Sequence, residues 1–205
     1  MTTSQAPVTN LQSKLFPFLN ELEDNWKTVL EELDSILYNE VEANKSYFTP
    51  WHETDIYSGS WDVYGLYSFG DKLESNCKYC PRTTELIEAI PGMVTAGFSA
   101  LGPETHIKPH VGYTNQVLRC HLGLVGPEIT TIDKSGNYWL RTGIDPEDKL
   151  PTCGMRVDDS IFQWNPGKAF VFDDTKEHEA WNFGNRTRFI LLIDFKKDSF
   201  PILNV

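Results

Sequence analysis

The sequence predicts a mainly β fold, a jelly roll or a β-sandwich, preceded by a helical segment. Two observations predict it. After Met93 the 205-residue chain becomes a series of short strand-like runs separated by turn signals, with no helical stretch between them, which argues against an α/β sheet. Before that point, apolar residues near the N-terminus recur at helical spacing. The length fits one domain that buries its own core.

The segment from Leu15 to about Tyr38 is predicted to form an amphipathic helix. Its apolar residues recur at steps of three and four, the spacing of one helix face. They are Leu19, Leu22, Trp26, Leu30, Leu33 and Leu37. The other face is acidic, and we expect it to be a solvated surface.

The following segment is aromatic and broken by turns. From Asn44 to Gly70 it predicts a loop followed by a strand near Trp61 to Tyr67. A short helix is predicted at Thr84 to Ala89, where Pro91 and Gly92 end it.

Short β-rich runs with turn residues between them fill the rest of the chain. They predict strands at Val94–Ala100, Gln116–Val125, Arg156–Phe162, Lys168–Phe172, Glu179–Phe183 and Arg188–Phe195, and a hairpin around Asp133–Gly136. We expect one structural unit, in which residues 1–60 form a helical extension packed on the core and residues 61–205 form the β domain.

Composition excludes several kinds of partner. The chain has 18 Lys and Arg against 29 Asp and Glu, a net charge of −11 with no basic stripe, so nucleic acid and anionic membrane surfaces are disfavoured. The apolar runs are strand-sized, and the first residues do not resemble a signal peptide, so we expect a cytoplasmic protein. The sequence leaves the oligomeric state open.

The four cysteines predict reduced thiols. They are Cys77, Cys80, Cys120 and Cys153, too few and too unevenly placed for a disulfide framework. Cys77 and Cys80 form a C-x-x-C pair, but without a second pair this is weak evidence for zinc. We interpret them as free thiols.

The histidines are the candidate metal ligands. Three of the five lie close together, at His106, His110 and His121. In a jelly roll, strands far apart in sequence face one cavity, so His110 and His178 can converge on a metal. Imidazole suits iron, zinc, copper and nickel alike. The alternative is that each is an ordinary core or surface histidine. Pro109 argues against a helix, so His106 is interpreted as a loop residue or as one that contacts a metal ligand without binding the metal itself.

Two longer motifs carry a family resemblance. "IKPHVGYTNQVLRCHLGL", followed by "FDDTKEHEAWNFGNRTRFILLIDF", resembles the aspartyl/asparaginyl β-hydroxylase family of iron(II)- and 2-oxoglutarate-dependent oxygenases. The resemblance extends upstream to about Trp61 and covers roughly the last two-thirds of the chain. It implies a double-stranded β-helix, the cupin-like form of the jelly roll.

The resemblance also implies roles for individual residues. His110 and His178 match the two iron ligands of the family, and Arg188 matches the arginine that pairs with the distal carboxylate of 2-oxoglutarate. A planar guanidinium suits a carboxylate held by two hydrogen bonds. Further cosubstrate contacts fall on Ser99, Arg119, His121 and Tyr67. Without the family context, Arg119 and His121 would equally fit the polar face of a strand.

Gly112 stands where many oxygenases have a third ligand. The commoner facial triad places a carboxylate two residues after the first histidine, and here that residue is glycine. The family shares this departure. An open iron could also accept a halide, so halogenation stays as an alternative. Asp173 or Asp174 could supply a carboxylate, but we expect them to orient the loop or to hydrogen-bond a ligating histidine.

The expected function is therefore a 2-oxoglutarate-dependent dioxygenase. With Fe(II), 2-oxoglutarate and O2, it would hydroxylate a C–H bond and release succinate and CO2. We expect a small amino-acid-like or natural-product substrate, because the sequence lacks a long helical-repeat region and membrane segments. The alternatives are an aspartyl/asparaginyl hydroxylase of a peptide or protein, a halogenase, and a jelly-roll protein that binds a metal or small acid without turnover.

Overall fold

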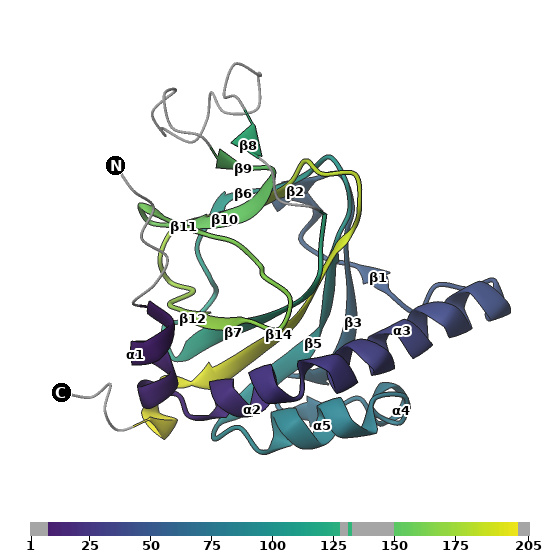
Figure 1. Ribbon diagram of the computed structural model, residues 1–205, viewed down its shortest axis with the longest axis horizontal. Helices are drawn as coiled ribbons and strands as arrows, with labels where there is room; N and C mark the ends of the chain where they lie inside the picture. Colours follow the sequence, from purple (N-terminus) through teal and green to yellow (C-terminus); the bar gives the residue numbers. More distant parts are fainter. Residues whose placement is uncertain (1–7, 128–130, 133–149, 201–205) are drawn as a thin grey trace.

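The computed structural model describes residues 8–127, 131–132 and 150–200 (Figure 1). Two antiparallel sheets pack face to face, as in a jelly roll. The seven-stranded sheet, here the large sheet, has the order β1-β3-β5-β14-β7-β12, with β4 paired to β3. The five-stranded sheet, here the small sheet, has the order β11-β10-β13-β6-β2, and β8 pairs with β9 separately.

The strands have the following bounds. The large sheet consists of β1 (Thr49–Pro50), β3 (Trp61–Ser68), β4 (Asp71–Lys72), β5 (Met93–Leu101), β7 (Val117–Val125), β12 (Ala169–Phe172) and β14 (Arg188–Lys196). The small sheet consists of β2 (Tyr57–Ser58), β6 (Thr105–His110), β10 (Cys153–Val157), β11 (Ser160–Phe162) and β13 (His178–Asn182). The separate pair is β8 (Thr131–Ile132) and β9 (Leu150–Pro151).

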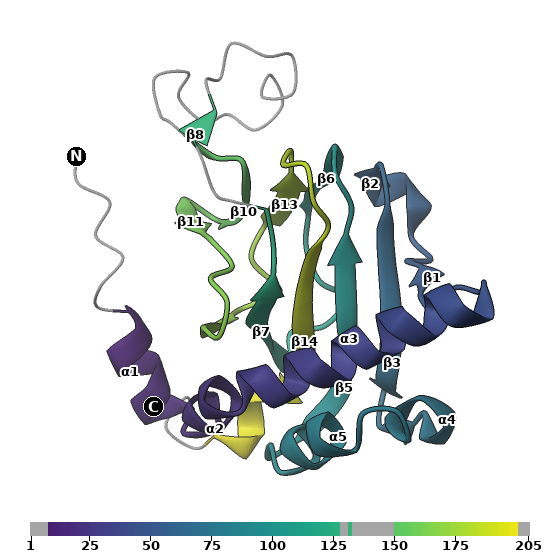
Figure 2. The ribbon, with the colours of Figure 1, turned by 45° about the vertical axis from the view of Figure 1, so that its right-hand side comes forward.

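Helices cover the outer face of the large sheet. They are α1 (Val8–Leu15), α2 (Phe18–Asp24), α3 (Trp26–Ala43), α4 (Glu74–Cys77) and α5 (Pro81–Glu88), with short 3-10 turns η1 (Thr54–Ile56) and η2 (Lys197–Ser199). Figure 2 shows α3 lying across the strands of the large sheet, with α5 beside it. Among the described residues, no helix is both long enough and apolar enough to span a bilayer.

Side chains alternate between the two faces of each strand, and they form two hydrophobic cores. Outward-facing residues such as Phe98 and Leu191 pack against buried residues of α2 and α3, for example Leu33. Inward-facing residues such as Trp61 of the large sheet meet Met155 of the small sheet. Because successive side chains on a strand point to opposite faces, the large sheet is apolar towards the helices and carries the polar candidates on its inner face.

The predicted N-terminal helix is interrupted. Instead of one helix from Leu15 to about Tyr38, α2 and α3 are separate helices that meet at Asn25, and Pro17 lies between α1 and α2. Proline has no amide hydrogen for the preceding turn, and the Asn25 side-chain amide donates to the Glu21 carbonyl at 2.8 Å, competing with a continuous helix. The apolar spacing still identifies the buried face.

Most predicted strands are present within one to three residues of their expected ends. The run Arg156–Phe162 is a hairpin, because the chain turns at Asp158, which has φ +46°. The prediction that His106 lies in a loop was wrong, since it lies on β6, where Pro109 is accommodated near the strand end. The hairpin predicted at Asp133–Gly136 lies outside the described residues.

Candidate functional site

His110 and His178 face each other across two neighbouring strands of the small sheet. They are register partners on β6 and β13, and their ring centroids are 4.2 Å apart. With metal–nitrogen bonds of about 2.1 Å, imidazole centroids about 4–5 Å apart are compatible with one shared metal ion. These two residues are called the histidine pair below.

The backbone fixes the orientation of both rings. Nδ1 of His110 lies 2.8 Å from the Lys108 carbonyl oxygen, and Nδ1 of His178 lies 2.8 Å from the Lys176 carbonyl oxygen. A carbonyl oxygen only accepts, so each Nδ1 carries a hydrogen, and Nε2 is the ring nitrogen left for a ligand. Burial, together with the charge of His110, lowers the pKa of His178 to about 4, which keeps its imidazole neutral and able to bind a metal at pH 7.

Asp174 explains why residue 112 is glycine. A Cβ placed on Gly112 would lie 1.9 Å from Oδ2 of Asp174, so the Asp174 carboxylate fills the space that a side chain at 112 would need. The Gly112 amide donates to the Asp174 carbonyl oxygen at 2.7 Å. The loop between β12 and β13 therefore lies directly against the residues that follow His110.

The Asp174 carboxylate is buried beside the histidine pair. Oδ1 lies 3.3 Å from Nε2 of His178 and 2.8 Å from Nη1 of Arg119. The arginine contact is a charge contact, since neither oxygen has a well-directed hydrogen bond within the described part of the chain. Burial raises the pKa of Asp174. Asp173, in contrast, holds the loop by accepting from Thr175 and Lys197.

The described ranges contain no group of three or more histidine, cysteine or carboxylate side chains placed to hold a metal ion together. The donor set for a metal is therefore the histidine pair, with Asp174 next to it. The four cysteines are buried and free.

Arg188 is a buried cation on the inner face of the large sheet. It is 2 % exposed, and its Nη1 donates to the carbonyl oxygen and the Oγ of Ser99 at 3.2 and 3.4 Å. Its Nε has no partner, and the described residues place no carboxylate at ion-pair distance from it. Burial lowers the pKa of Arg188 to about 10, so the guanidinium is charged at pH 7. A buried cation without a carboxylate partner is suited to an anionic ligand.

His121 and two tryptophans complete this region. His121 accepts a hydrogen bond at Nδ1 from Trp164 Nε1 at 3.2 Å, and its buried Nε2 has no hydrogen-bond partner in the described part of the chain. Trp61 Nε1 donates to Ser99 Oγ at 3.0 Å. Burial, with the charge of Arg119 next, lowers the pKa of His121 well below its usual value. The anion end is the name used below for Ser99, His121, Trp164 and Arg188.

Arg119 and Tyr67 have other partners. Arg119 lies on the same face of β7 as His121 but makes two hydrogen bonds with Asp194, at 2.7 and 2.9 Å, in addition to its contact with Asp174. Tyr67 does not join the group. A register shift after Gly65 pairs Tyr67 with Ala96, so it packs on the helix side and its hydroxyl lies 2.5 Å from Glu88 of α5.

Sequence reasoning missed Trp61, Trp164 and the position of Asp174. Trp61 was assigned only to a strand, although a tryptophan at a strand start needs a partner for its N–H when it is buried. Trp164 stands just before the turn Asn165-Pro166-Gly167, and that context gives no periodicity signal. The place of Asp174 depends on the packing of two loops.

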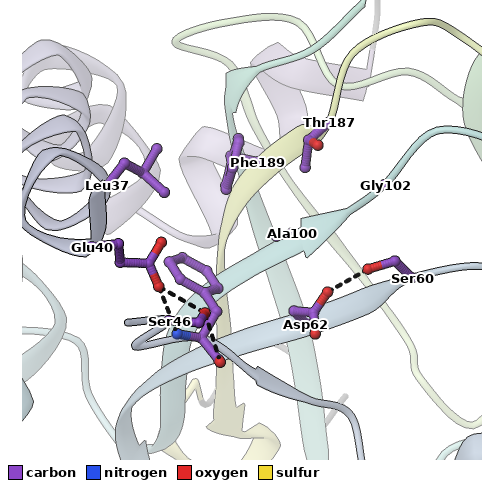
Figure 3. A pocket seen from close by; sticks show the side chains of 10 residues that line it. Leu37, Glu40, Ser46, Ser60, Asp62, Ala100, Gly102, Thr187 and Phe189 are labelled. Atoms are coloured by element: carbon purple, nitrogen blue, oxygen red, sulfur yellow. Dashed lines mark hydrogen bonds between the residues drawn. The ribbon is translucent and has the colours of Figure 1, made fainter. Parts of the chain in front are cut away.

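A separate cavity lies on the opposite face of the large sheet. It measures about 250 Å³ and lies between the C-terminal half of α3 and the ends of β3, β5 and β14 (Figure 3). Its polar groups include Glu40, which accepts from Ser46, and Asp62, which accepts from Ser60. None of the predicted site residues lines it. The candidate site is therefore placed between the sheets.

Comparison with known proteins decides the family. The family model described as aspartyl/asparaginyl beta-hydroxylase matches residues 23–198. The chain belongs to the aspartyl/asparaginyl β-hydroxylase family. Among members of this hydroxylase family, it is similar to the ornithine lipid ester-linked acyl 2-hydroxylase of Rhizobium tropici, with 37 % identity over 189 residues, 89 % of this chain and 58 % of the relative.

The chain is also similar to proteins at lower sequence identity. The chain is 32 % identical to human aspartyl/asparaginyl beta-hydroxylase over 183 residues, 86 % of this chain and 20 % of the relative. It thus spans 58 % and 20 % of the lengths of these two relatives. A predicted oxalate decarboxylase from Thermotoga maritima has a TM-score of 0.44 at 10 % identity, covering 75 % of this chain and 95 % of that one.

Proposed function

We propose that this hydroxylase-family chain is an iron(II)- and 2-oxoglutarate-dependent dioxygenase. In the overall reaction, one oxygen atom of O2 enters the substrate C–H bond as a hydroxyl group. The other enters the succinate formed when 2-oxoglutarate loses CO2. The observation that supports this most is the combination of two adjacent imidazoles, each held through Nδ1 by a carbonyl oxygen, with a buried arginine that has no carboxylate partner among the described residues.

The histidine pair would hold the iron through the two Nε2 atoms. Iron bound there supplies the activation of dioxygen that C–H hydroxylation requires. The protein contributes the fixed ring orientations, because both Nδ1–H groups are held by carbonyl oxygens 2.8 Å away. Such outer hydrogen bonds set the tautomer and the basicity of ligating histidines.

The anion end would bind 2-oxoglutarate. The Arg188 guanidinium would pair with the distal carboxylate, with the Ser99 hydroxyl beside it, and His121 would donate from its unpartnered Nε2. Charge-assisted hydrogen bonds of this kind are the strong ones in protein sites. Arg119 would contact the cosubstrate on the side nearer Asp174, with which it already makes a charge contact.

Asp174 favours hydroxylation over halogenation. A halide at the position left by Gly112 would have to share the space of the Asp174 carboxylate, which overlaps the place of a Cβ at residue 112. Like charges at such short range repel strongly in a buried site.

We propose an amino-acid-derived substrate. Both relatives have names that include an amino acid, as ornithine lipid or as aspartyl and asparaginyl residues. A screen of free amino acids, peptides and amino-acid lipids, scored by substrate-dependent succinate release, tests the class. Preference for a folded protein domain would contradict a small-molecule substrate.

The cosubstrate test is anaerobic. Adding Fe(II) and then 2-oxoglutarate to the protein should produce the weak visible charge-transfer band of a chelated keto acid. Absence of the band, together with absence of succinate for every substrate, would favour a non-catalytic metal-binding protein.

A further inference from the structure

Trp164 contacts two residues of the anion end at once. It is 6 % exposed and follows β11. Its indole N–H donates to His121 Nδ1 at 3.2 Å, and the Arg188 guanidinium carbon lies 4.4 Å from the centroid of its ring. Within the described ranges, the two residues it touches are the ones with buried side-chain nitrogen atoms that lack a hydrogen-bond partner, His121 Nε2 and Arg188 Nε.

The hydrogen bond determines where the proton of His121 lies. An indole N–H can only donate, so Nδ1 of His121 must accept and must be unprotonated. The one proton of the neutral ring is then on Nε2, which makes Nε2 a donor that faces no acceptor within the described residues. Burial keeps the ring neutral by lowering its pKa.

The stacking contact holds Arg188 without neutralising it. A carboxylate partner would compensate the guanidinium charge and occupy its N–H groups. An aromatic face attracts the cation through its π electrons and leaves the in-plane N–H groups available. Since Ser99 uses only Nη1, the Nε–H group stays free for a ligand.

We propose that Trp164 is a positioning residue for 2-oxoglutarate binding. One indole presets the Nε2–H tautomer of His121 and holds the Arg188 guanidinium in place, so that two donors are ready for an anionic ligand. The cosubstrate part of this proposal rests on the proposed function, whereas the tautomer part does not.

The test compares two conservative variants. Trp164→Phe keeps an aromatic face for Arg188 but loses the N–H donor, and Trp164→Leu loses both. Titration calorimetry of Mn(II)-loaded protein should show 2-oxoglutarate affinity about threefold to tenfold weaker for Trp164→Phe, and more than tenfold weaker for Trp164→Leu. Mn(II) affinity should change less than twofold, because the histidine pair is untouched.

Trp181→Phe is the matched control. Trp181 is fully buried, and its N–H donates to the Pro151 carbonyl oxygen at 2.7 Å, in a separate cluster with Leu150. This variant also removes an indole N–H group, but from a different part of the protein core. We expect unchanged 2-oxoglutarate affinity, with thermal unfolding recorded for every variant. Equal losses of affinity in Trp164→Phe and Trp181→Phe would indicate general destabilisation and overturn the proposal.

Nitrogen-15 NMR of His121 gives the second readout. In wild type without cosubstrate, the ring should be neutral with the proton on Nε2, and Trp164→Phe should change the Nδ1 shift. A wild-type ring protonated on Nδ1 would overturn the proposal whether or not 2-oxoglutarate binds. Failure of wild type to bind 2-oxoglutarate, with His121 in the expected tautomer, would refute the proposed cosubstrate and the cosubstrate role of Trp164 while supporting the tautomer assignment.

Discussion

The histidine pair and the anion end are held in place by different kinds of contact. Each imidazole of the pair is oriented by a carbonyl oxygen two residues earlier in its own chain segment. The anion end depends on side chains far apart in sequence: His121 and Trp164 are 43 residues apart, and Arg188 and Ser99 are 89 residues apart. Local contacts form wherever the strand forms, whereas distant ones require the complete fold. The ring orientations of the histidine pair should therefore tolerate distant substitutions better than the contacts of the anion end.

The largest expected effect is that of His178→Ala. Removing one of two protein ligands should abolish iron-dependent succinate formation and reduce bound iron to near zero, because a single imidazole cannot hold the ion tightly. Iron content and succinate release measure this. The variant should still bind 2-oxoglutarate weakly at Arg188. Near-wild-type turnover would mean that His178 is not a metal ligand.

Gly112→Ala should affect the histidine pair through Asp174. The added Cβ would overlap the Asp174 carboxylate, and relieving such a clash typically costs about 2 kcal/mol of unfolding free energy. Chemical denaturation measures this cost, and iron affinity should fall with it. The double variant Gly112→Ala/Asp174→Ala should regain the stability lost to the clash. Failure of Asp174→Ala to relieve the effect would mean that the steric conflict lies elsewhere.

Arg188→Ala should weaken 2-oxoglutarate binding and leave iron in place. Hydrogen bonds to charged groups contribute about 1.5–3 kcal/mol each, so affinity should fall at least tenfold. Arg188→Lys should recover only part of the loss, since an ammonium group keeps the charge but lacks the planar arrangement. Titration of both variants, with iron content checked, tests this. Unchanged 2-oxoglutarate affinity in the alanine variant would indicate that the cosubstrate binds at Arg119 instead.

The smallest effect is expected for Tyr67→Phe. Its hydroxyl is bonded to Glu88 on the helix side of the large sheet, so 2-oxoglutarate affinity should change less than twofold. The same titration as for Arg188 measures it. A tenfold loss would mean that Tyr67 reaches the cosubstrate after all.

Residues in regular strands could be predicted from the sequence, and residues at irregularities could not. Alternation placed Arg119 and His121 on one face of β7, and the two long motifs led to His110, His178 and Arg188. The resemblance suggested a cosubstrate contact for Tyr67, but a strand irregularity places Tyr67 on the helix side, and no sequence pattern marks that shift. The position of Asp174 follows from contact between two loops, so only the folded chain reveals why Gly112 has no side chain.

The same distinction applies to the N-terminal helices. The spacing of leucines correctly identified the face that packs on the large sheet, because burial follows the helical period. It did not show the break at Asn25, where the side-chain amide donates to the same Glu21 carbonyl oxygen as the Asn25 backbone amide. The spacing of apolar residues indicates which face of a helix is buried, whereas capping residues and proline determine where the helix ends.

On the outer face of the small sheet, Glu179 joins three strands. It is fully buried on β13, with one oxygen 2.8 Å from His106 Nε2 on β6 and the other 2.7 Å from Arg156 Nε on β10. A slip of one residue between β6 and β13 would turn one imidazole of the histidine pair away from the other and would also pull Glu179 from His106. The contact between Glu179 and His106 thus opposes the slip that would separate the histidine pair. On the proposed function, a metal ion would find its two imidazoles already assembled, and little of its binding energy would be spent on ordering them.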